Sequence, residues 1–145
     1  MERDPEVTDS SPVDPFAPAR LGPVTLRNRI VKAATFEGVM PDALVTDQLI
    51  DYHRTVAVGG VGMTTVAYLA VSPEGRTGAE CIWLRSAAVP GLARLTDAIH
   101  AEGAAIAAQI GHAGPVADGR STGLPALAPT RRLNPLSMRL VRAAT

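Results

Sequence analysis

The sequence lacks several features that would assign it to a particular class of protein. Cys81 is the single cysteine in 145 residues, which excludes an internal disulfide and a metal site built from several cysteines. No apolar run is long enough to cross a bilayer, and the first residues lack the apolar core of a signal peptide. We therefore expect a cytoplasmic protein with no membrane partner and no bound metal.

Net charge is absent as well, because 14 lysines and arginines balance 14 aspartates and glutamates. A neutral chain gives no sign of a nucleic-acid partner. The charges are unevenly placed: residues 1–14 hold five acids against one arginine, and the last fifteen residues hold four arginines and no acid. We expect 1–14 to be a flexible acidic segment, and we interpret the arginines as a solvated tail. A βαβ module that binds an acidic partner through this tail remains an alternative.

The sequence does contain an alternation of β-rich and helical segments, which follows a hairpin signal at Gly22 and Pro23. The predicted elements are a strand at 29–36, a helix at 46–58, a strand at 61–71, a helix at 90–103 and a strand at 104–110. Beyond residue 111 glycine and proline are frequent, and the one element that we expect there is a helix beginning within 135–145.

Helix signals support the first helix in particular. Thr46 is suited to cap its amino end, and the pair of glycines after residue 58 is suited to end it. Leu49, Tyr52 and Val56 recur at helical spacing and predict its buried stripe. We expect His53, in the middle of this helix, to be structural or exposed.

Strands that alternate with helices predict βαβ units with parallel strands, and ligands of such folds bind at the carboxyl ends of the strands. Those ends are 34–37, 68–71 and 109–112. The third carries a glutamine, Gln109, and a histidine, His112. A glutamine at a strand end is more often solvated or capped than a ligand, so the strand ends alone leave its role open.

Three stretches, taken together, resemble the amino-terminal part of the old yellow enzyme family of NADH:flavin oxidoreductases. They are LRNRIVKAATFEG, GGVGMTTVAYLAVSPEGR and AQIGHAG. The resemblance implies an α/β fold: a partial (β/α)8 barrel made of the first three βα units, preceded by a hairpin. It makes residues 15–145 the amino-terminal portion of an FMN-binding barrel domain, since a closed barrel takes roughly 250 residues.

The resemblance also implies a set of site residues. The residues that would contact FMN are Ala33, Ala34, Thr35, Phe36, Tyr68 and Gln109. Gln109 would pair with the pyrimidine edge of the flavin, because a primary amide offers a donor and an acceptor together. Glu37 and His112 are possible pocket residues; an exposed carboxylate and a hydrogen bond within the loop are equally open readings of these two.

The activity implied is an FMN-dependent reduction of a small molecule, such as an activated alkene, by NADH or NADPH through flavin N5. The family's catalytic residues and phosphate-binding loops come later than Thr145, so we expect no catalytic residue in this chain. Two further expectations follow: a truncated remnant that needs a complementing chain is an alternative, and uncovered barrel edges would favour self-association. Phe36 stands where many members carry a hydroxyl or thiol donor to the flavin.

Overall fold

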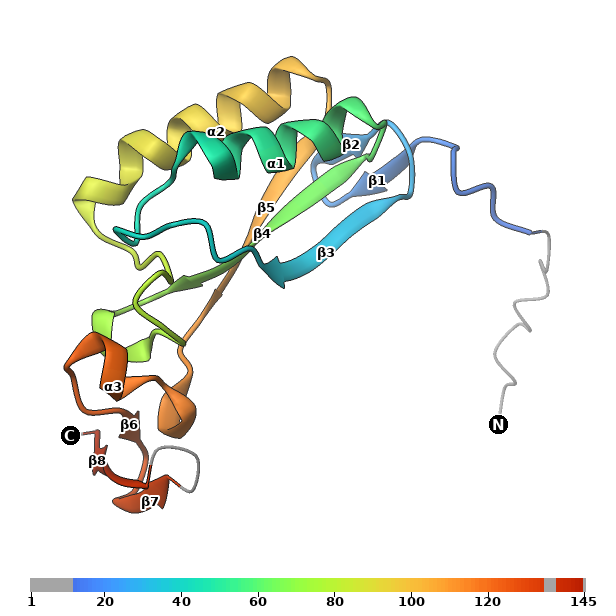
Figure 1. The fold of residues 1–145 in the computed structure, drawn as a ribbon. Helices are drawn as coiled ribbons and strands as arrows, with labels where there is room; N and C mark the ends of the chain where they lie inside the picture. Colours follow the sequence, from blue (N-terminus) through green and yellow to red (C-terminus); the bar gives the residue numbers. More distant parts are fainter. Residues whose placement is uncertain (1–11, 135–137, 145) are drawn as a thin grey trace, which may run out of the picture.

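A computed structural model describes residues 12–134 and 138–144 of the chain. Its centre is a three-stranded parallel sheet with two helices on one face (Figure 1). The strands are β3 (Val31–Phe36), β4 (Met63–Ala70) and β5 (Ala105–Gly111), in the order β3-β4-β5, and the helices are α1 (Asp47–Val58) and α2 (Val89–Ala101). The alternation predicted from the sequence is therefore confirmed.

The hairpin predicted at Gly22 and Pro23 is present. Strand β1 (Ala19–Leu21) pairs with β2 (Val24–Leu26) in an antiparallel ladder, and Gly22 between them has a φ of 56°, which favours glycine. The arginine that follows, Arg27, donates from Nε to the Val61 carbonyl at 3.0 Å and from Nη1 to the Glu102 carbonyl at 2.9 Å. Both acceptors precede a strand of the sheet, so Arg27 fixes the hairpin exit at the amino ends of β4 and β5.

Helix α1 begins and ends where the sequence predicts, but a different stripe is buried. The Thr46 hydroxyl accepts from the Leu49 amide at 3.1 Å, and the helix stops at Gly59. Its buried residues are Leu49, His53 and Ala57. The prediction that Tyr52 belongs to this stripe is wrong, since 43% of its surface is exposed.

Helix α2 closes one hydrophobic core against the sheet. Pro90 lies in its first turn, and its buried residues are Leu95 and Ile99. Gly103 follows the end of the helix with a φ of 72°. The core residues come from both helices, the sheet and the connecting loops: Met40, Leu49, Ala57, Val66, Leu69, Ile82, Ala88, Leu95, Ile99 and Ala104. The connection between β4 and α2 contains two short 3-10 turns, η1 (Pro73–Gly75) and η2 (Ser86–Ala88).

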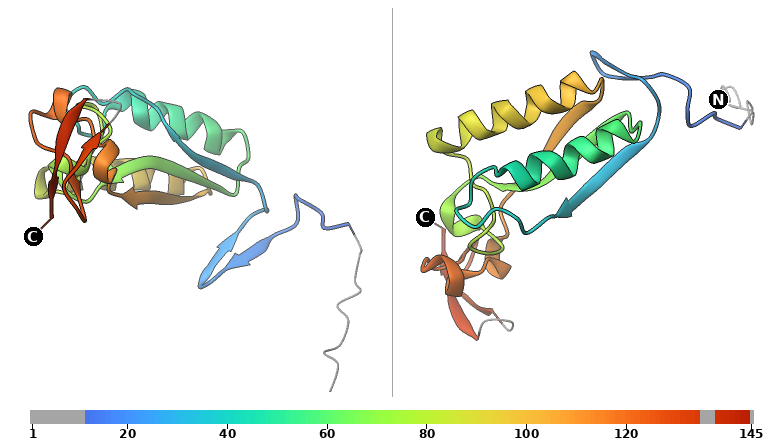
Figure 2. Two further views of the ribbon diagram at one scale, coloured as in Figure 1. Left: turned by 90° about the horizontal axis from the view of Figure 1, so that it is seen from below. Right: turned by 45° about the horizontal axis from the view of Figure 1, so that its top comes forward.

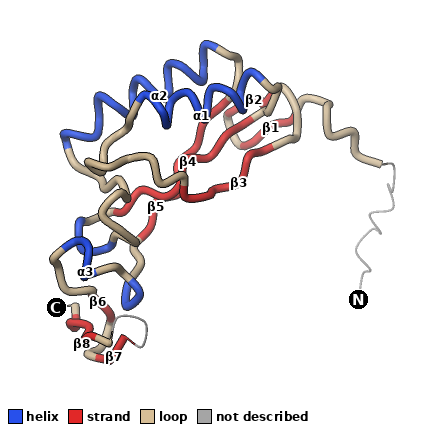
Figure 3. Tube along the Cα trace, viewed as in Figure 1, coloured by secondary structure: helices blue, strands red, loops and turns tan. Residues whose placement is uncertain are grey.

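The region after β5 contains more structure than the sequence predicts. The elements there are η3 (Gly114–Val116), α3 (Gly119–Thr122), β6 (Leu127–Ala128), β7 (Arg132–Asn134) and β8 (Arg139–Ala143). The three strands form a small sheet in the order β6-β8-β7, beyond the carboxyl ends of β4 and β5 (Figures 2 and 3).

The helix expected within 135–145 is therefore wrong for 139–143, which form β8. The physical reason is burial: Val141 is 1% exposed and packs in a second small core with Ala117, Ala126 and Ala128. Residues 135–137 lie outside the described part, as do residues 1–11 of the predicted acidic segment. Within the described ranges, no helix has both the length and the apolar character that a membrane span requires.

Candidate functional site

The three predicted strand ends lie on one edge of the sheet. In the parallel register Phe36 pairs with Ala67, and Ala70 pairs with Gly111. Neighbouring strands are ~4.8 Å apart, so the end of β3 lies roughly 10 Å from β5. The two outer strands are thus close enough for one small planar molecule to span the edge.

A register shift places Tyr68 and Gln109 on the face that the helices do not cover. Val66 pairs with Ala108 and Leu69 with Ile110, so two residues of β4 oppose the single residue Gln109. Val66 and Leu69 belong to the core under the helices, and the residues between these pairs therefore point to the opposite face.

The Tyr68 side chain is held in place on this open face. A Cβ placed on Gly111 would lie 3.3 Å from the Tyr68 ring, so glycine at this position allows the ring to pack closely against β5. The Tyr68 hydroxyl donates to the Gly75 carbonyl, and burial raises the pKa of this phenol. Tyr68 thereby ties the loop after β4 to the edge of the sheet.

Strand β3 contains a second register shift. Lys32 pairs with Thr64 and Thr35 with Val66, so Ala33 and Ala34 together oppose one residue of β4. Thr35, paired with the core residue Val66, lies toward the helices because of the bulge; strict alternation from Lys32 would place it on the open face. The next residue, Phe36, is 49% exposed and lies at the tip of the strand.

The Gln109 side chain is exposed, and within the described part of the chain its amide makes no hydrogen bond. Its strand neighbours on the open face are small, since Ala107 precedes it by two positions and Gly111 follows by two. A free amide beside alanine and glycine fits the edge of a flat heteroaromatic ring, because it supplies one donor group and one acceptor with no bulky side chain in the way. The donor set suits a flavin pyrimidine edge.

Glu37 and His112 lie elsewhere. The Glu37 side chain is 3% exposed and turns toward α1, where its Oε1 accepts from Lys32 Nζ at 2.6 Å; it lines a cavity there with Thr35 and Phe36, so its role as a pocket residue stays a prediction. The His112 side chain is exposed, and its Nδ1 accepts from the Gly114 amide at 2.8 Å. The structure thus shows His112 bonded within its own loop.

Sequence reasoning missed the polar group under α1. His53 Nδ1 lies 2.7 Å from Thr64 Oγ1, and His53 Nε2 lies 3.5 Å from Glu37 Oε1. Lys32 in the middle of an apolar strand was the available signal. The described residues contain no group of three or more histidines, cysteines, aspartates or glutamates placed to hold a metal ion.

Comparison with known proteins identifies the family. Residues 14–128 match the sequence model of the NADH:flavin oxidoreductase / NADH oxidase family. The chain is 62% identical over 130 residues to a 4,4'-dithiodibutanoate disulfide reductase of Rhodococcus erythropolis, covering 90% of this chain and 32% of that protein. It is 41% identical over 115 residues to a metal reductase of Desulforamulus reducens, covering 79% of this chain and 17% of that protein.

Comparison with solved structures finds reductases with a similar fold. The structure of a 2-naphthoyl-CoA reductase in complex with 2-naphthoyl-CoA superposes with a TM-score of 0.82 at 26% identity, covering 90% of this chain and 22% of that one. The chain thus spans about a third or less of the length of these relatives.

Proposed function

Because the chain belongs to the NADH:flavin oxidoreductase / NADH oxidase family and forms part of a (β/α)8 barrel, we propose that it supplies the flavin-contacting strands of an FMN-dependent NAD(P)H oxidoreductase. We place this activity in the cytoplasm, where an unpaired cysteine stays reduced. The observation that carries the proposal is the exposed Gln109 amide, on the open face of the sheet at the edge that it shares with the ends of β3 and β4.

The residues present account for binding and orientation. When bound, FMN supplies hydride transfer through N5 between a reduced nicotinamide and an electrophilic substrate. The Gln109 amide would donate to one carbonyl of the pyrimidine edge and accept from its N–H, which fixes the ring in its plane. Ala33, Ala34 and Tyr68 would line the ring from the neighbouring strands, with Thr35 and Phe36 at the end of β3.

Two classes of electron acceptor fit this reaction. The first is an activated alkene, which takes the hydride on one carbon and a proton on the other. The second is an organic disulfide, which the relative named as a disulfide reductase favours at 62% identity. For a disulfide, NAD(P)H and one proton yield two thiols and NAD(P)+, so two electrons are transferred in either case.

The proposal includes a partner for the outer sides of the sheet, along β3 and along β5. Among the described strands, β3 and β5 each pair with β4 alone, and unpaired parallel edges invite further strands. We propose that these edges accept the remaining strands of the barrel, from this polypeptide or a complementing chain, and that they self-associate when those strands are missing. Without them, the chain is a non-catalytic piece of the barrel.

The test is FMN titration of the 145-residue chain, alone and mixed with a polypeptide that carries the remaining barrel strands of the R. erythropolis relative. The expected result is flavin absorbance that co-elutes with the protein. Gln109→Leu should lower the FMN affinity at least tenfold, and the control Thr25→Leu, at an exposed position of β2, should not. NADH and NADPH oxidation is then followed with 2-cyclohexenone and with 4,4'-dithiodibutanoate. Absence of FMN binding in both samples, or equal effects of the two variants, would overturn the proposal.

A further inference from the structure

The bulge in β3 lies within the segment that the proposed function places against the flavin. Three steps along β3, from Lys32 to Thr35, match two steps along β4, from Thr64 to Val66. A bulge of this kind bends the strand and redirects the side chains that follow. Whatever holds the bulge therefore determines how residues 33–36 face their ligand.

One lysine spans the bulge. Lys32 Nζ donates to the Thr65 carbonyl at 3.2 Å and to Glu37 Oε1 at 2.6 Å. Thr65 is the β4 residue opposite the two bulged alanines, where the ladder is interrupted. The ammonium group thus satisfies a carbonyl at the interruption and joins it to the residue immediately after β3. The ion pair is nearly enclosed, with side chains 13% and 3% exposed.

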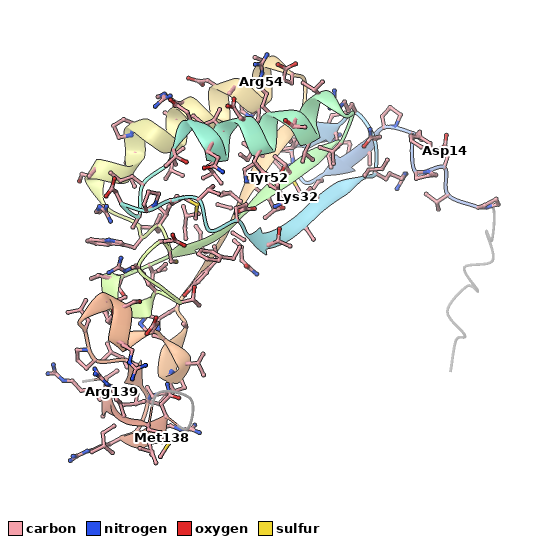
Figure 4. All side chains as sticks on the ribbon, in the orientation of Figure 1. Asp14, Lys32, Tyr52, Arg54, Met138 and Arg139 are labelled. Atoms are coloured by element: carbon pink, nitrogen blue, oxygen red, sulfur yellow. The ribbon has the colours of Figure 1, made fainter. Side chains whose placement is uncertain are left out.

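Helix α1 covers this ion pair with an aromatic ring. Lys32 Nζ lies 5.2 Å from the centre of the Tyr52 ring, and Figure 4 shows the two side chains side by side between β3 and α1. The neighbouring residue, His53, contacts Tyr52 edge to face, with ring centres 5.2 Å apart. The exposed Tyr52, which packs poorly as a core residue, has a function here as a cover.

His53 connects the ion pair to β4. Burial, together with the Lys32 charge, lowers the pKa of His53 to about 4, so the imidazole is neutral at pH 7. His53 Nε2 lies 3.5 Å from Glu37 Oε1 and has no hydrogen-bond partner among the described residues. Because a carboxylate only accepts hydrogen bonds, its negative charge favours the tautomer that carries the proton on Nε2. Nδ1 then accepts from the Thr64 hydroxyl at 2.7 Å.

Stability alone does not account for the buried Lys32–Glu37 ion pair and the polar side chains around it. Glu37 Oε2 is buried and has no hydrogen-bond partner among the described residues, and buried ion pairs often stabilise a fold no better than apolar residues of the same size. Its members come from β3 and the residue that follows it, from α1 and from β4, and they gather beside the bulge. A role in fixing geometry accounts for both facts.

We propose that a buried polar cluster under α1 is the positioning device that holds the bulge of β3 and thereby sets which side chains of residues 33–36 turn to the open face, where the proposed function places the flavin. The members of this positioning cluster are Lys32, Glu37, His53 and Thr64. The part of the proposal that concerns flavin rests on the proposed function; the part that concerns the bulge does not.

The experiment separates positioning from stability. Glu37→Gln and Lys32→Met break the ion pair, whereas the double variant Lys32→Met/Glu37→Leu removes both charges. We expect each single variant to lower stability and to shift the backbone amide NMR resonances of residues 33–36, with at least a tenfold loss of their hydrogen-exchange protection. The double variant should recover most of the stability and keep the shifted resonances, and its FMN dissociation constant should stay at least tenfold above wild type.

Two further variants keep the test decisive. Arg54→Met/Glu102→Leu removes an exposed ion pair of 2.7 Å elsewhere in the fold and should leave the resonances of residues 33–36 unchanged. Thr64→Val removes one hydroxyl and serves if a charge variant fails to fold; it should shift the same resonances. Wild-type resonances and flavin affinity in the double variant, or unmoved resonances in Thr64→Val, would overturn the proposal. A wild-type chain that binds no flavin even when the remaining barrel strands are added defeats the proposed function, while the resonances still decide the bulge.

Discussion

The two faces of the parallel sheet differ in what their side chains contact. On the face toward α1 and α2, Leu49, Leu95 and Ile99 are completely or almost completely buried, and the charged residues are paired. On the other face the Tyr68 ring lies among small residues such as Ala107 and Gly111, and the Gln109 amide has no partner within the described chain. The contrast indicates that the helix side holds the fold together, and that the open side is available for a ligand.

The largest expected effect comes from deleting apolar volume on one face and then on the other. Leu95→Ala removes a completely enclosed side chain and should lower the free energy of unfolding by about 3 kcal/mol. Val31→Ala, at a strand position that is 44% exposed, should cost less than about 1 kcal/mol. Urea unfolding followed by far-UV circular dichroism measures both, and equal costs would mean that the open face is as tightly packed as the helix side.

The next largest effect is the pH dependence of the free energy of unfolding, which we assign to His53 on the helix side of the sheet. The pKa of His53 is lowered from 6.5 to about 4, so the unfolded chain binds more protons than the folded chain between these values. The stability that depends on neutral His53 is therefore fully present above pH 6.5 and is lost as the pH falls toward 4. The loss is up to about 3 kcal/mol, at ~1.4 kcal/mol per pKa unit.

Two histidine variants identify the source of that loss. Urea unfolding between pH 7 and pH 4.5 should show a smaller loss in His53→Gln than in the wild type. His100→Gln, which changes an exposed histidine in α2, should keep the wild-type pH dependence. A loss that is unchanged in His53→Gln would assign the acid sensitivity to other groups.

A third prediction concerns the open face. Gln109→Leu should lower FMN affinity about ten- to a hundredfold, since two hydrogen bonds of about 0.5–1.5 kcal/mol each disappear. Gln109→Glu keeps an acceptor but loses the donor, and should fail to restore binding. Neither change should alter the free energy of unfolding by more than about 0.5 kcal/mol. Fluorescence titration with FMN provides the affinities, and full binding by Gln109→Glu would show that only an acceptor is needed.

The parts of the fold that could be predicted are those set by local signals. Thr46 caps a helix through its own hydroxyl, and Gly22 and Gly103 have positive φ angles that glycine tolerates. Strand β8 was missed because a five-residue strand that contains two arginines, Arg139 and Arg142, has no helical or alternating pattern that stands out. Val141, in the middle of this strand, packs against Ala117, Ala126 and Ala128, which lie well before it in the chain.

For the candidate site, the sequence predicts the position of the strand ends but not the direction of every side chain. Parallel alternation placed the three strand ends together, but the bulges that decide which face Ala34 and Tyr68 take leave no mark in composition. The side chain of Glu37 turns away from the open face because Lys32 and His53 are there to receive it. Only the tertiary structure brings these partners together.

The smallest expected effect concerns the end of β3, where the two faces meet. The backbone register pairs Phe36 with Ala67 of the open-face side, and phenylalanine donates no hydrogen bond to a flavin. Phe36→Thr supplies a hydroxyl that would stabilise the electron-rich reduced ring, so the reduction potential of bound FMN should rise. Phe16→Thr changes the other of the two phenylalanines, which is 71% exposed near the amino end, and should leave the potential unchanged. A spectroscopic redox titration in which Phe36→Thr and Phe16→Thr behave alike would show that residue 36 does not reach the flavin, and that the open face ends one residue earlier.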